Sequence, residues 1–345
     1  MKNRKICGVP FSNFMLHVDP KSNGNIIYMA CCPAWLNPPY NSSIMSIPED
    51  DSGFINLDSL WNSKSMVTFR KSVVDGSYSF CNILKCPYYV SDDLSPLPDR
   101  AKELIERGVF EMDYPPSYIQ ANIDRACNLT CPSCREYPNA QPNPKSYVRL
   151  KSLLLSGVES IYLNGTGEIF RNQYLLSALN EITKETYPNL KTVGIISNGT
   201  LLNKTMWASL SKGFKSLVKR IDISVDAASE QIYRKVRVGG NFSRLLDNLH
   251  FIGSLKKENE IENFSISLVL QKVNIHELLN FIKLAKDVNA DAVCILRIED
   301  WHARPHQEFL DNMALPVNWE VTYKDYLEEA RKLAVDNSIY FFSNL

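Results

Sequence analysis

The sequence lacks several features that would mark other classes of protein. No apolar run reaches the roughly 18 residues that a membrane-spanning helix needs. The basic start, MKNRKICGVPFSNF, has no continuous apolar stretch behind it, so we do not expect a signal peptide. Glycine (14) and proline (18) are too few among 345 residues for a collagen-like or low-complexity chain. We therefore expect a globular, cytoplasmic protein.

An excess of charge of one sign is also absent. Lysine plus arginine and aspartate plus glutamate each number 38, so the formal net charge is zero. Without a broad basic surface, the chain would attract neither a phosphate backbone nor an anionic lipid layer. We therefore expect neither a nucleic acid nor a membrane as a partner.

The nine cysteines are the most informative residues that are present. A reducing compartment disfavours disulfides, and clustered cysteines in such a chain more often ligate metal or take part in catalysis. Eight of the nine precede residue 135, in two groups followed by a single residue: Cys7, Cys31, Cys32, Cys81 and Cys86; Cys127, Cys131 and Cys134; and Cys294. This distribution predicts two metal-bearing regions followed by a scaffold with little metal chemistry of its own.

Three segments differ in their pattern of apolar residues. Residues 1–95 read as a small irregular domain, and residues 96–116 read as a linker. From 117 to 345, strand-like runs alternate with helical stretches, which implies parallel βα units. The seven expected strands cover 118–123, 160–163, 192–197, 220–225, 263–270, 292–298 and 339–342. This repetition favours an α/β fold with a partial (β/α)6 TIM-like barrel over an open doubly wound sheet, although periodicity alone leaves both open.

Three cysteines directly follow the first expected strand of that segment. Cys127, Cys131 and Cys134 are separated by three and then two residues. Three thiolates on one short loop suit three irons of a [4Fe–4S] cluster, and they leave the fourth iron open to an external chelator. The alternative is structural zinc, which needs four protein ligands. No further His or Cys pair follows at zinc-finger spacing, so we favour the cluster.

This spacing resembles the signature of radical S-adenosylmethionine (radical SAM) enzymes, and three further motifs at expected strand ends support the resemblance. Asn164-Gly165-Thr166-Gly167-Glu168 resembles the Gly-Gly-Glu motif of that family, and Ser197-Asn198-Gly199-Thr200 resembles its Ser/Thr-Asn-Gly motif. Ile223-Ser224-Val225-Asp226, followed by Tyr233, Arg234 and the stretch 237–242, matches a segment common in the subfamily with auxiliary clusters. One departure is Ser133, where the family most often carries an aromatic residue beside the adenine.

The resemblance implies a role for each of these residues. Cys127, Cys131 and Cys134 would bind a [4Fe–4S] cluster whose open iron takes the amino and carboxylate groups of S-adenosylmethionine. Gly165 and Gly167 would let the backbone approach the methionine part, and Glu168 would accept a hydrogen bond from its amino group. Ser197 and Asn198 would meet the ribose or carboxylate, with Ser224 and Asp226 on the same face. Structural roles remain open: a turn at the glycines, a helix entry capped by Asn203, and an N-cap from Asp226.

The five amino-terminal cysteines would supply a second, auxiliary [4Fe–4S] cluster. With Trp35, residues 60–63 and the spacing of Cys81 and Cys86 before Pro87, the region resembles a SPASM domain, here placed before the barrel rather than after it. Adjacent residues on a strand point to opposite sides, so we favour Cys31 as the ligand and Cys32 as a packing residue. Zinc stays open here, because scattered thiolates suit it equally well. Cys294 reads as a small buried hydrophobe.

The family resemblance implies an enzyme in which one electron from the reduced cluster splits S-adenosylmethionine and yields a 5′-deoxyadenosyl radical. That radical abstracts hydrogen from a substrate, and an electron donor such as flavodoxin or ferredoxin would supply the reducing electron. We expect an oxidoreductase or maturase that oxidatively modifies a peptide or other natural product. Dehydrogenation of an alcohol or amine on a small polar molecule is the alternative. A non-catalytic electron-transfer or zinc-binding module is the alternative from another class.

Overall fold

The computed structural model describes residues 6–18, 25–37, 46–91, 93–134, 140–163, 167–300 and 305–344. The chain divides into two compact units. The first comprises Met1–Arg125, Asn143–Gly165 and Tyr174–Val193, and the second comprises Ala126–Pro142, Thr166–Gln173 and Gly194–Leu345. Within the described residues, no helix is both long enough and apolar enough to cross a membrane.

The first unit contains a mixed sheet in the strand order β5-β4-β1-β2-β3. Its elements are α1 (Val9–Ser12), β1 (Asn13–Val18), β2 (Ile26–Met29), η1 (Pro33–Trp35), β3 (Ser46–Ile47), α2 (Leu57–Trp61), α3 (Lys64–Val74), α4 (Pro87–Val90), α5 (Asp99–Glu106), β4 (Tyr118–Asn122), α6 (Lys145–Leu155), β5 (Ser160–Leu163) and α7 (Gln173–Asn180). β1 pairs in parallel with β4, and β4 pairs in parallel with β5, whereas β1–β2 and β2–β3 are antiparallel.

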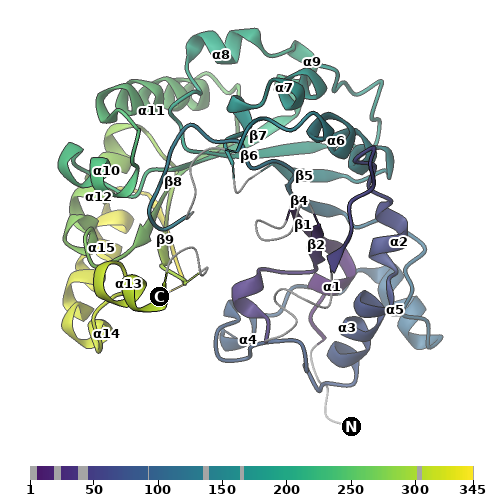
Figure 1. Ribbon diagram of the computed structural model, residues 1–345. Helices are drawn as coiled ribbons and strands as arrows, with labels where there is room; N and C mark the ends of the chain where they lie inside the picture. Colours follow the sequence, from purple (N-terminus) through teal and green to yellow (C-terminus); the bar gives the residue numbers. More distant parts are fainter. Residues whose placement is uncertain are drawn as a thin grey trace. The chain divides into compact units, whose positions relative to one another are not determined.

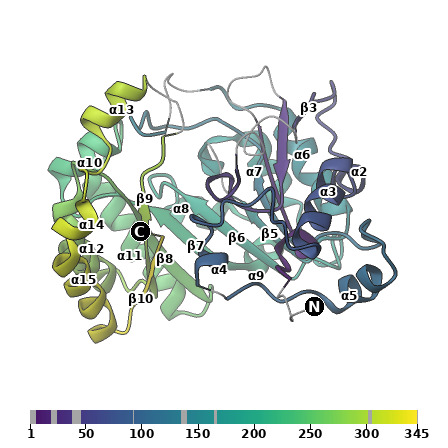
Figure 2. The same cartoon turned by 90° about the horizontal axis from the view of Figure 1, so that it is seen from below.

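Helices α2 and α3 cover the amino-terminal strands of this unit (Figure 2). The ring of Phe14 on β1 meets Trp61 of α2 edge-on, with 6.1 Å between the ring centroids. Arg70 of α3 is buried, and its guanidinium donates hydrogen bonds to the carbonyls of Pro10, Trp61 and Phe110 while it lies 4.1 Å above the Trp61 ring. One buried cation therefore satisfies three carbonyls and joins α1, α2 and α3.

The second unit contains strands in the order β10-β9-β8-β7-β6 (Figure 1). Its elements are η2 (Ile169–Arg171), β6 (Thr192–Ser197), α8 (Lys204–Ser209), α9 (Lys212–Leu217), β7 (Val218–Ser224), α10 (Glu230–Val236), α11 (Phe242–Lys257), β8 (Asn263–Leu270), η3 (Ile275–Glu277), α12 (Leu278–Asp287), β9 (Ala292–Arg297), α13 (His306–Asn312), α14 (Trp319–Thr322), α15 (Lys324–Asp336) and β10 (Tyr340–Ser343). The pairs β7–β8, β8–β9 and β9–β10 are parallel.

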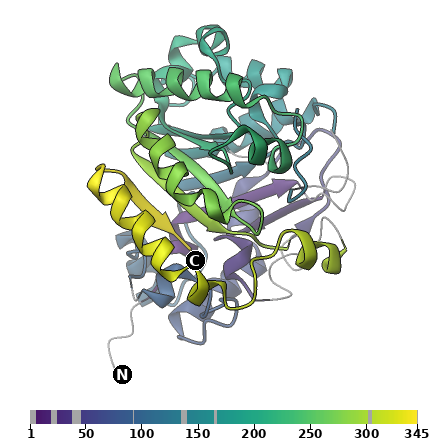
Figure 3. The same cartoon turned by 90° about the vertical axis from the view of Figure 1, so that its left-hand side faces the viewer.

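The two faces of these strands differ in chemistry because alternate side chains point to opposite sides. Ile221, Ile223 and Ile266 are fully buried, and α11 and α12 contact β8. Helix α15 contacts both α12 and β10, as Figure 3 shows. The alternate positions are smaller or polar, among them Ser224 and Ser267, which face each other across the β7–β8 pair. Polar groups thus collect on one face and at the strand ends.

The structure confirms the predicted α/β fold class, with helices after the parallel strands β4, β5, β7, β8 and β9, and is consistent with a partial (β/α) barrel. All seven strands expected after residue 117 form. Between β9 and β10 the chain forms, among others, the two helices α14 and α15, which Tyr323 separates. The parallel pairing of β1 with β4 was not expected from the sequence. The domain boundaries at 95 and 117 stay predictions.

Candidate functional site

The three-cysteine loop lies in the second unit and is held by backbone hydrogen bonds at both ends. The Glu168 amide donates to the carbonyl of Ala126 at 2.6 Å, just before the loop. The Thr130 amide donates to the carbonyl of Val238 at 2.9 Å, in the connection between α10 and α11. The Cys134 amide donates to the Cys131 carbonyl at 3.1 Å, which closes a turn. Segments far apart in sequence therefore fix the loop.

Two of the three thiols already have donors directed at sulfur. Cys127 Sγ lies 3.5 Å from the Leu129 amide nitrogen and 3.7 Å from Asn198 Nδ2. Cys131 Sγ lies 3.8 Å from Arg237 Nη1. Burial raises the pKa of the Cys131 thiol, and the positive charge of Arg237 opposes that rise. Such donors stabilise a sulfur that carries negative charge, as a thiolate or cluster ligand does.

Glu168 is buried, and its carboxylate joins the two predicted motifs that follow β5 and β6. Oε1 accepts hydrogen bonds from Ser197 Oγ at 2.9 Å and from the Phe170 amide at 3.3 Å. Oε2 accepts from the Asn198 amide at 2.7 Å. Burial raises the pKa of Glu168, although these three donors act against the rise. The structure therefore brings Glu168, Ser197 and Asn198 together, as the sequence predicts, and leaves acceptor capacity on Oε2.

The side chain of Asn198 turns towards the cysteine loop. Its Nδ2 donates to Asn128 Oδ1 at 3.0 Å, and its Oδ1 accepts from the amide and hydroxyl of Thr200. Asn128 Nδ2 in turn donates to Thr200 Oγ1 at 2.8 Å. These three side chains tie the end of β6 to the loop. Sequence reasoning did not single out Asn128, whose only signal was its place inside the cysteine motif.

The glycines of the motifs differ in what the structure requires of them. Gly165 lies outside the described residues, and Gly167 is half-buried just before Glu168. Gly199 has a φ of +73°, and a Cβ there would lie 2.7 Å from side-chain carbons of both Ile223 and Leu245. Only glycine combines this backbone angle with so close an approach. The helix entry considered from sequence is also real, because Asn203 Oδ1 caps α8 by accepting from the Met206 amide.

Asp226 follows β7 and engages Arg237. Its φ of +62° is unusual for a residue with a side chain, and Oδ1 accepts from the Val269 amide at 2.7 Å. Oδ2 lies 2.8 Å from Arg237 Nη2, in a pair whose side chains are only 5% and 13% exposed. Asp226 does not cap α10, because Ser229 does. Ser224 ends β7 and is half-buried. Contact of Ser224 or Asp226 with a cofactor stays a prediction.

Two buried polar atoms beside this pair have no partner among the described residues: Arg237 Nε and the hydroxyl of Tyr233. Tyr233 is fully buried, and burial raises its pKa to about 12, so its hydroxyl keeps its proton and can donate. An unpaired buried donor costs about 1–3 kcal/mol. A group with acceptor atoms beside Cys131 would remove that cost. The donor set and the thiols therefore fit a sulfide-bearing cluster.

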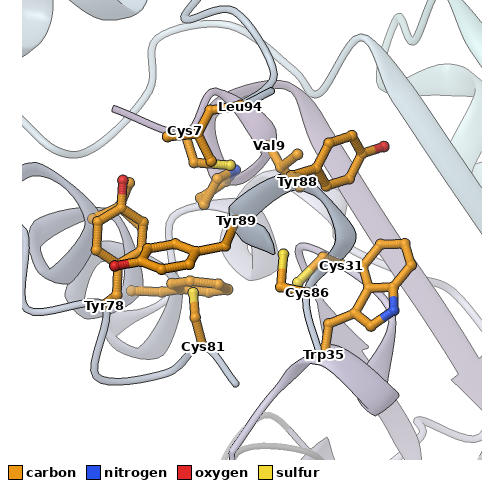
Figure 4. Close-up of a pocket in the computed structure, with 13 residues that line it drawn as sticks. Cys7, Val9, Cys31, Trp35, Tyr78, Cys81, Cys86, Tyr88, Tyr89 and Leu94 are labelled. Carbon is orange, nitrogen blue, oxygen red and sulfur yellow. The ribbon is translucent and has the colours of Figure 1, made fainter. Parts of the chain in front are cut away.

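Four of the amino-terminal cysteines line one cavity in the first unit, which encloses about 420 Å³ of empty space counting its open mouth. These are Cys7, Cys31, Cys81 and Cys86. Figure 4 shows the sulfur atoms of Cys31 and Cys86 close together, with Trp35 and Tyr88 beside them. Cys32 is not among the lining residues, in keeping with the preference for Cys31.

The walls of this cavity are aromatic and aliphatic rather than polar. Burial raises the pKa of Cys31 well above its ordinary value, and the nearby thiols Cys81 and Cys86 raise it further. Burial also raises the pKa of Cys81 to about 12. The thiols of Cys31 and Cys81 in this apolar space would therefore hold their protons until a metal centre displaced them. Cys294 lies on β9 and is half-buried rather than fully buried as expected.

No three His, Cys, Asp or Glu side chains converge closely enough to hold one metal ion anywhere in the part of the chain that the structure describes. A zinc site brings its ligands to within about 2.0–2.3 Å of a single ion. The cysteines of a cubane bind different irons, so they stand apart around a larger group.

Comparison with known proteins agrees with these motifs. Residues 122–285 match the model of the Radical SAM superfamily, which confirms the family predicted from the sequence and, with it, an enzyme class. The match begins at the end of β4, runs through the cysteine loop, Glu168 and Asn198, and includes all of α10 and α11.

Curated relatives are distant and matched in part. The chain is 24% identical over 181 residues to GTP 3′,8-cyclase of Limosilactobacillus fermentum, covering 49% of this chain and 51% of that one. It is 22% identical over 219 residues to the molybdenum cofactor biosynthesis protein moc-5 of Caenorhabditis elegans, covering 57% and 35%. The chain spans about half the length, or less, of these curated relatives. The solved structure of Streptococcus suis SuiB aligns with 99% of this chain and 72% of its own, with a TM-score of 0.50 and 14% identity, a likeness of fold alone.

Proposed function

We propose that this chain, which belongs to the radical SAM superfamily, holds a [4Fe–4S] cluster on Cys127, Cys131 and Cys134. The bound cluster would supply one electron that splits S-adenosylmethionine into methionine and a 5′-deoxyadenosyl radical. The observation that carries this proposal is the loop itself, in which two of the three thiols, Cys127 and Cys131, receive N–H donors beside two unpartnered buried donors. Three protein ligands leave one iron for the amino and carboxylate groups of S-adenosylmethionine.

Other residues of the second unit would bind S-adenosylmethionine and hold the cysteine loop in place. Glu168 is fixed by three donors with one oxygen partly available, so it can accept a hydrogen bond from the amino group of S-adenosylmethionine. Asn128, Asn198 and Thr200 hold the loop against the end of β6. Ser224, at the end of β7, would line the nucleoside side of the site, and Gly167 would let the backbone approach the methionine part. A site made by strand ends excludes water from the radical.

We further propose that Cys7, Cys31, Cys81 and Cys86 hold a second [4Fe–4S] cluster with no open iron. Support comes from the apolar cavity that all four thiols line. A fully ligated cluster can accept an electron from a substrate radical, which favours a net oxidation. A SPASM-like character for this region rests on the sequence resemblance.

For the substrate, we propose a peptide or other natural product that undergoes oxidative modification. The supporting feature is the second cluster, because oxidation leaves an electron that must be accepted. A nucleotide is the second candidate, favoured by sequence relatives that are named GTP 3′,8-cyclases. The reducing electron would come from a small protein such as flavodoxin or ferredoxin. A cytoplasmic location also stays a prediction.

The test is anaerobic reconstitution of the full chain with iron and sulfide, followed by dithionite and S-adenosylmethionine. We expect 5′-deoxyadenosine in chromatography and about eight irons per chain, as two cubanes require. Absence of 5′-deoxyadenosine would favour a non-catalytic module, and about four irons plus one zinc would reassign the amino-terminal site. Deuterium transferred into 5′-deoxyadenosine from labelled GTP, but not from labelled peptide, would reverse the order of the two substrate candidates.

A further inference from the structure

We propose that Arg237 is a positioning residue that places a positive charge against the Cys131 corner of the cluster and raises its reduction potential. The proposal rests on the proposed function, since it takes the three-cysteine loop to hold a cluster. It adds a residue outside the cysteine loop that raises the reduction potential of the cluster.

The geometry of Arg237 directs its guanidinium at Cys131. Arg237 follows the last residue of α10, and its backbone amide donates to the Tyr233 carbonyl at 2.7 Å, so the helix end fixes the start of the side chain. The next residue, Val238, accepts from Thr130 of the cysteine loop. Nη1 then lies 3.8 Å from Cys131 Sγ, while Nε is buried without a partner among the described residues. An N–H donor therefore remains for a cluster atom.

Asp226 holds the opposite side of the guanidinium. Its own carboxylate is anchored by the Val269 amide, and its carbonyl accepts from Asn274 Nδ2 at 2.9 Å. The pair Asp226–Arg237 is nearly buried, so the side chain of Arg237 cannot easily turn away to solvent. A buried ion pair of this kind contributes little to folding stability, because the cost of desolvating both charges offsets their attraction. Its position is better explained by the orientation that it gives the guanidinium beside Cys131.

The electrostatic consequence follows from the charge that the cluster gains on reduction. A cation near the sulfurs, and N–H donors to them, stabilise the more negative reduced form and raise the reduction potential. Water screens this interaction little where both partners are buried. Asp226 partly cancels the effect because its negative charge lies on the far side of the same guanidinium. Removing Arg237 should therefore lower the potential, and neutralising Asp226 should raise it.

Arg234 provides a matched control on the same helix. Its side chain is 72% exposed and pairs with Glu230 one turn away. Arg234→Gln removes a charge from the last turn of α10, and Arg237→Gln removes the same charge from the residue that caps this helix. Only the second removes it from the buried side against Cys131.

The experiment is an anaerobic redox titration of the reconstituted full chain, followed by electron paramagnetic resonance of the signal that S-adenosylmethionine perturbs. We expect Arg237→Gln to lower the ratio of reduced to oxidised cluster at a fixed potential at least tenfold, which is about 59 mV for one electron. Arg234→Gln should leave the ratio within twofold of wild type. A wild type without a cluster signal that responds to S-adenosylmethionine would defeat the proposed function itself. Equal ratios in the two arginine variants would overturn this inference alone.

Asp226→Asn covers the case in which Arg237→Gln retains no cluster. Asparagine tolerates the positive φ of this position, and its side-chain oxygen can still accept from Val269. The variant should raise the ratio of reduced to oxidised cluster at the same potential. An unchanged or lower ratio would contradict the proposal, because a purely structural pair would not raise the potential.

Discussion

The two groups of cysteines differ both in how the chain supplies them and in what surrounds them. Cys127, Cys131 and Cys134 come from one loop of the second unit, whereas the cavity of the first unit collects thiols from Cys7 to Cys86. The loop sulfurs meet amide, asparagine and arginine donors. The cavity offers mainly aromatic and aliphatic walls. A polar surrounding with one ligand missing suits exchange of a ligand and an electron, and an apolar cavity with four thiols suits a closed centre.

The largest expected effect separates the two groups by activity. Cys127→Ala should abolish formation of 5′-deoxyadenosine, because the loop cluster loses one of its three ligands. Cys81→Ala should leave part of this activity and impair formation of the substrate-derived product. Cys294→Ala is the matched control and should retain both. Chromatography of 5′-deoxyadenosine and of product after anaerobic turnover measures the difference, and equal loss in Cys127→Ala and Cys81→Ala would remove the distinction between the groups.

Iron content tests whether Cys31 or Cys32 is the cluster ligand in the first unit. Cys31→Ala should reduce the reconstituted iron from about eight to about four per chain, because a cubane needs its cysteine ligands. Cys32→Ala changes the neighbouring residue, which does not line the cavity, and should keep about eight. Iron and sulfide assays on the two variants measure this difference. The reverse result would make Cys32 the ligand.

A smaller effect is expected at the glycine beside Cys7. A Cβ on Gly8 would lie 1.9 Å from the carbonyl oxygen of Pro96, so Gly8→Ala must displace backbone next to the cavity. We expect a loss of about 2 kcal/mol in unfolding free energy, with lower iron in the first unit only. Gly108→Ala is the control: it has a φ of +71° but open space, so it should cost about 1 kcal/mol without loss of iron. Denaturant unfolding and iron assays test both. Unchanged iron in Gly8→Ala would show that the cavity does not depend on this approach.

The smallest expected effect is a pH dependence at Glu168. Its pKa is raised by burial, so the folded protein keeps this proton at pH values where the unfolded chain has lost it. Stability contributed by this group should therefore fall as pH rises from the unfolded value of about 4.3 to the folded one. Glu168→Gln should flatten that fall in the metal-free protein. Thermal unfolding of both proteins across pH 4.5 to 7 provides the measurement, and parallel curves would show that Glu168 does not titrate in this range.

Much of the second unit could be predicted from the sequence because its signals are local. The cysteine spacing, Glu168 and the segment 197–200 each follow an expected strand, and the structure brings Glu168, Ser197 and Asn198 into contact. The pairing of Arg237 with Asp226 was not predicted, although both residues lie in a recognised motif. The geometry of this pair depends on the residue at which α10 ends. Hydrophobic periodicity in the sequence does not predict a helix end to the residue.

The first unit was harder to predict because its contacts are long-range. The pairing of β1 with β4 joins strands about a hundred residues apart. The apolar pattern of a strand does not identify the distant strand with which it pairs. The cavity likewise depends on the fold to bring Cys7 to Cys81. The argument from strand geometry for Cys31 over Cys32 had a wrong premise, because β2 ends at Met29 and Cys32 precedes η1. Cys31 nevertheless lines the cavity and Cys32 does not.

The central claim is that the three-cysteine loop leaves one iron for S-adenosylmethionine. The most direct measurement is the electron paramagnetic resonance spectrum of the reduced Cys81→Ala chain, which we expect to carry only the loop cluster, before and after S-adenosylmethionine with a ¹⁵N-labelled amino group is added. The account predicts a changed spectrum and a hyperfine coupling to that nitrogen. An unaltered spectrum without coupling, in a chain that holds the cluster, would contradict it.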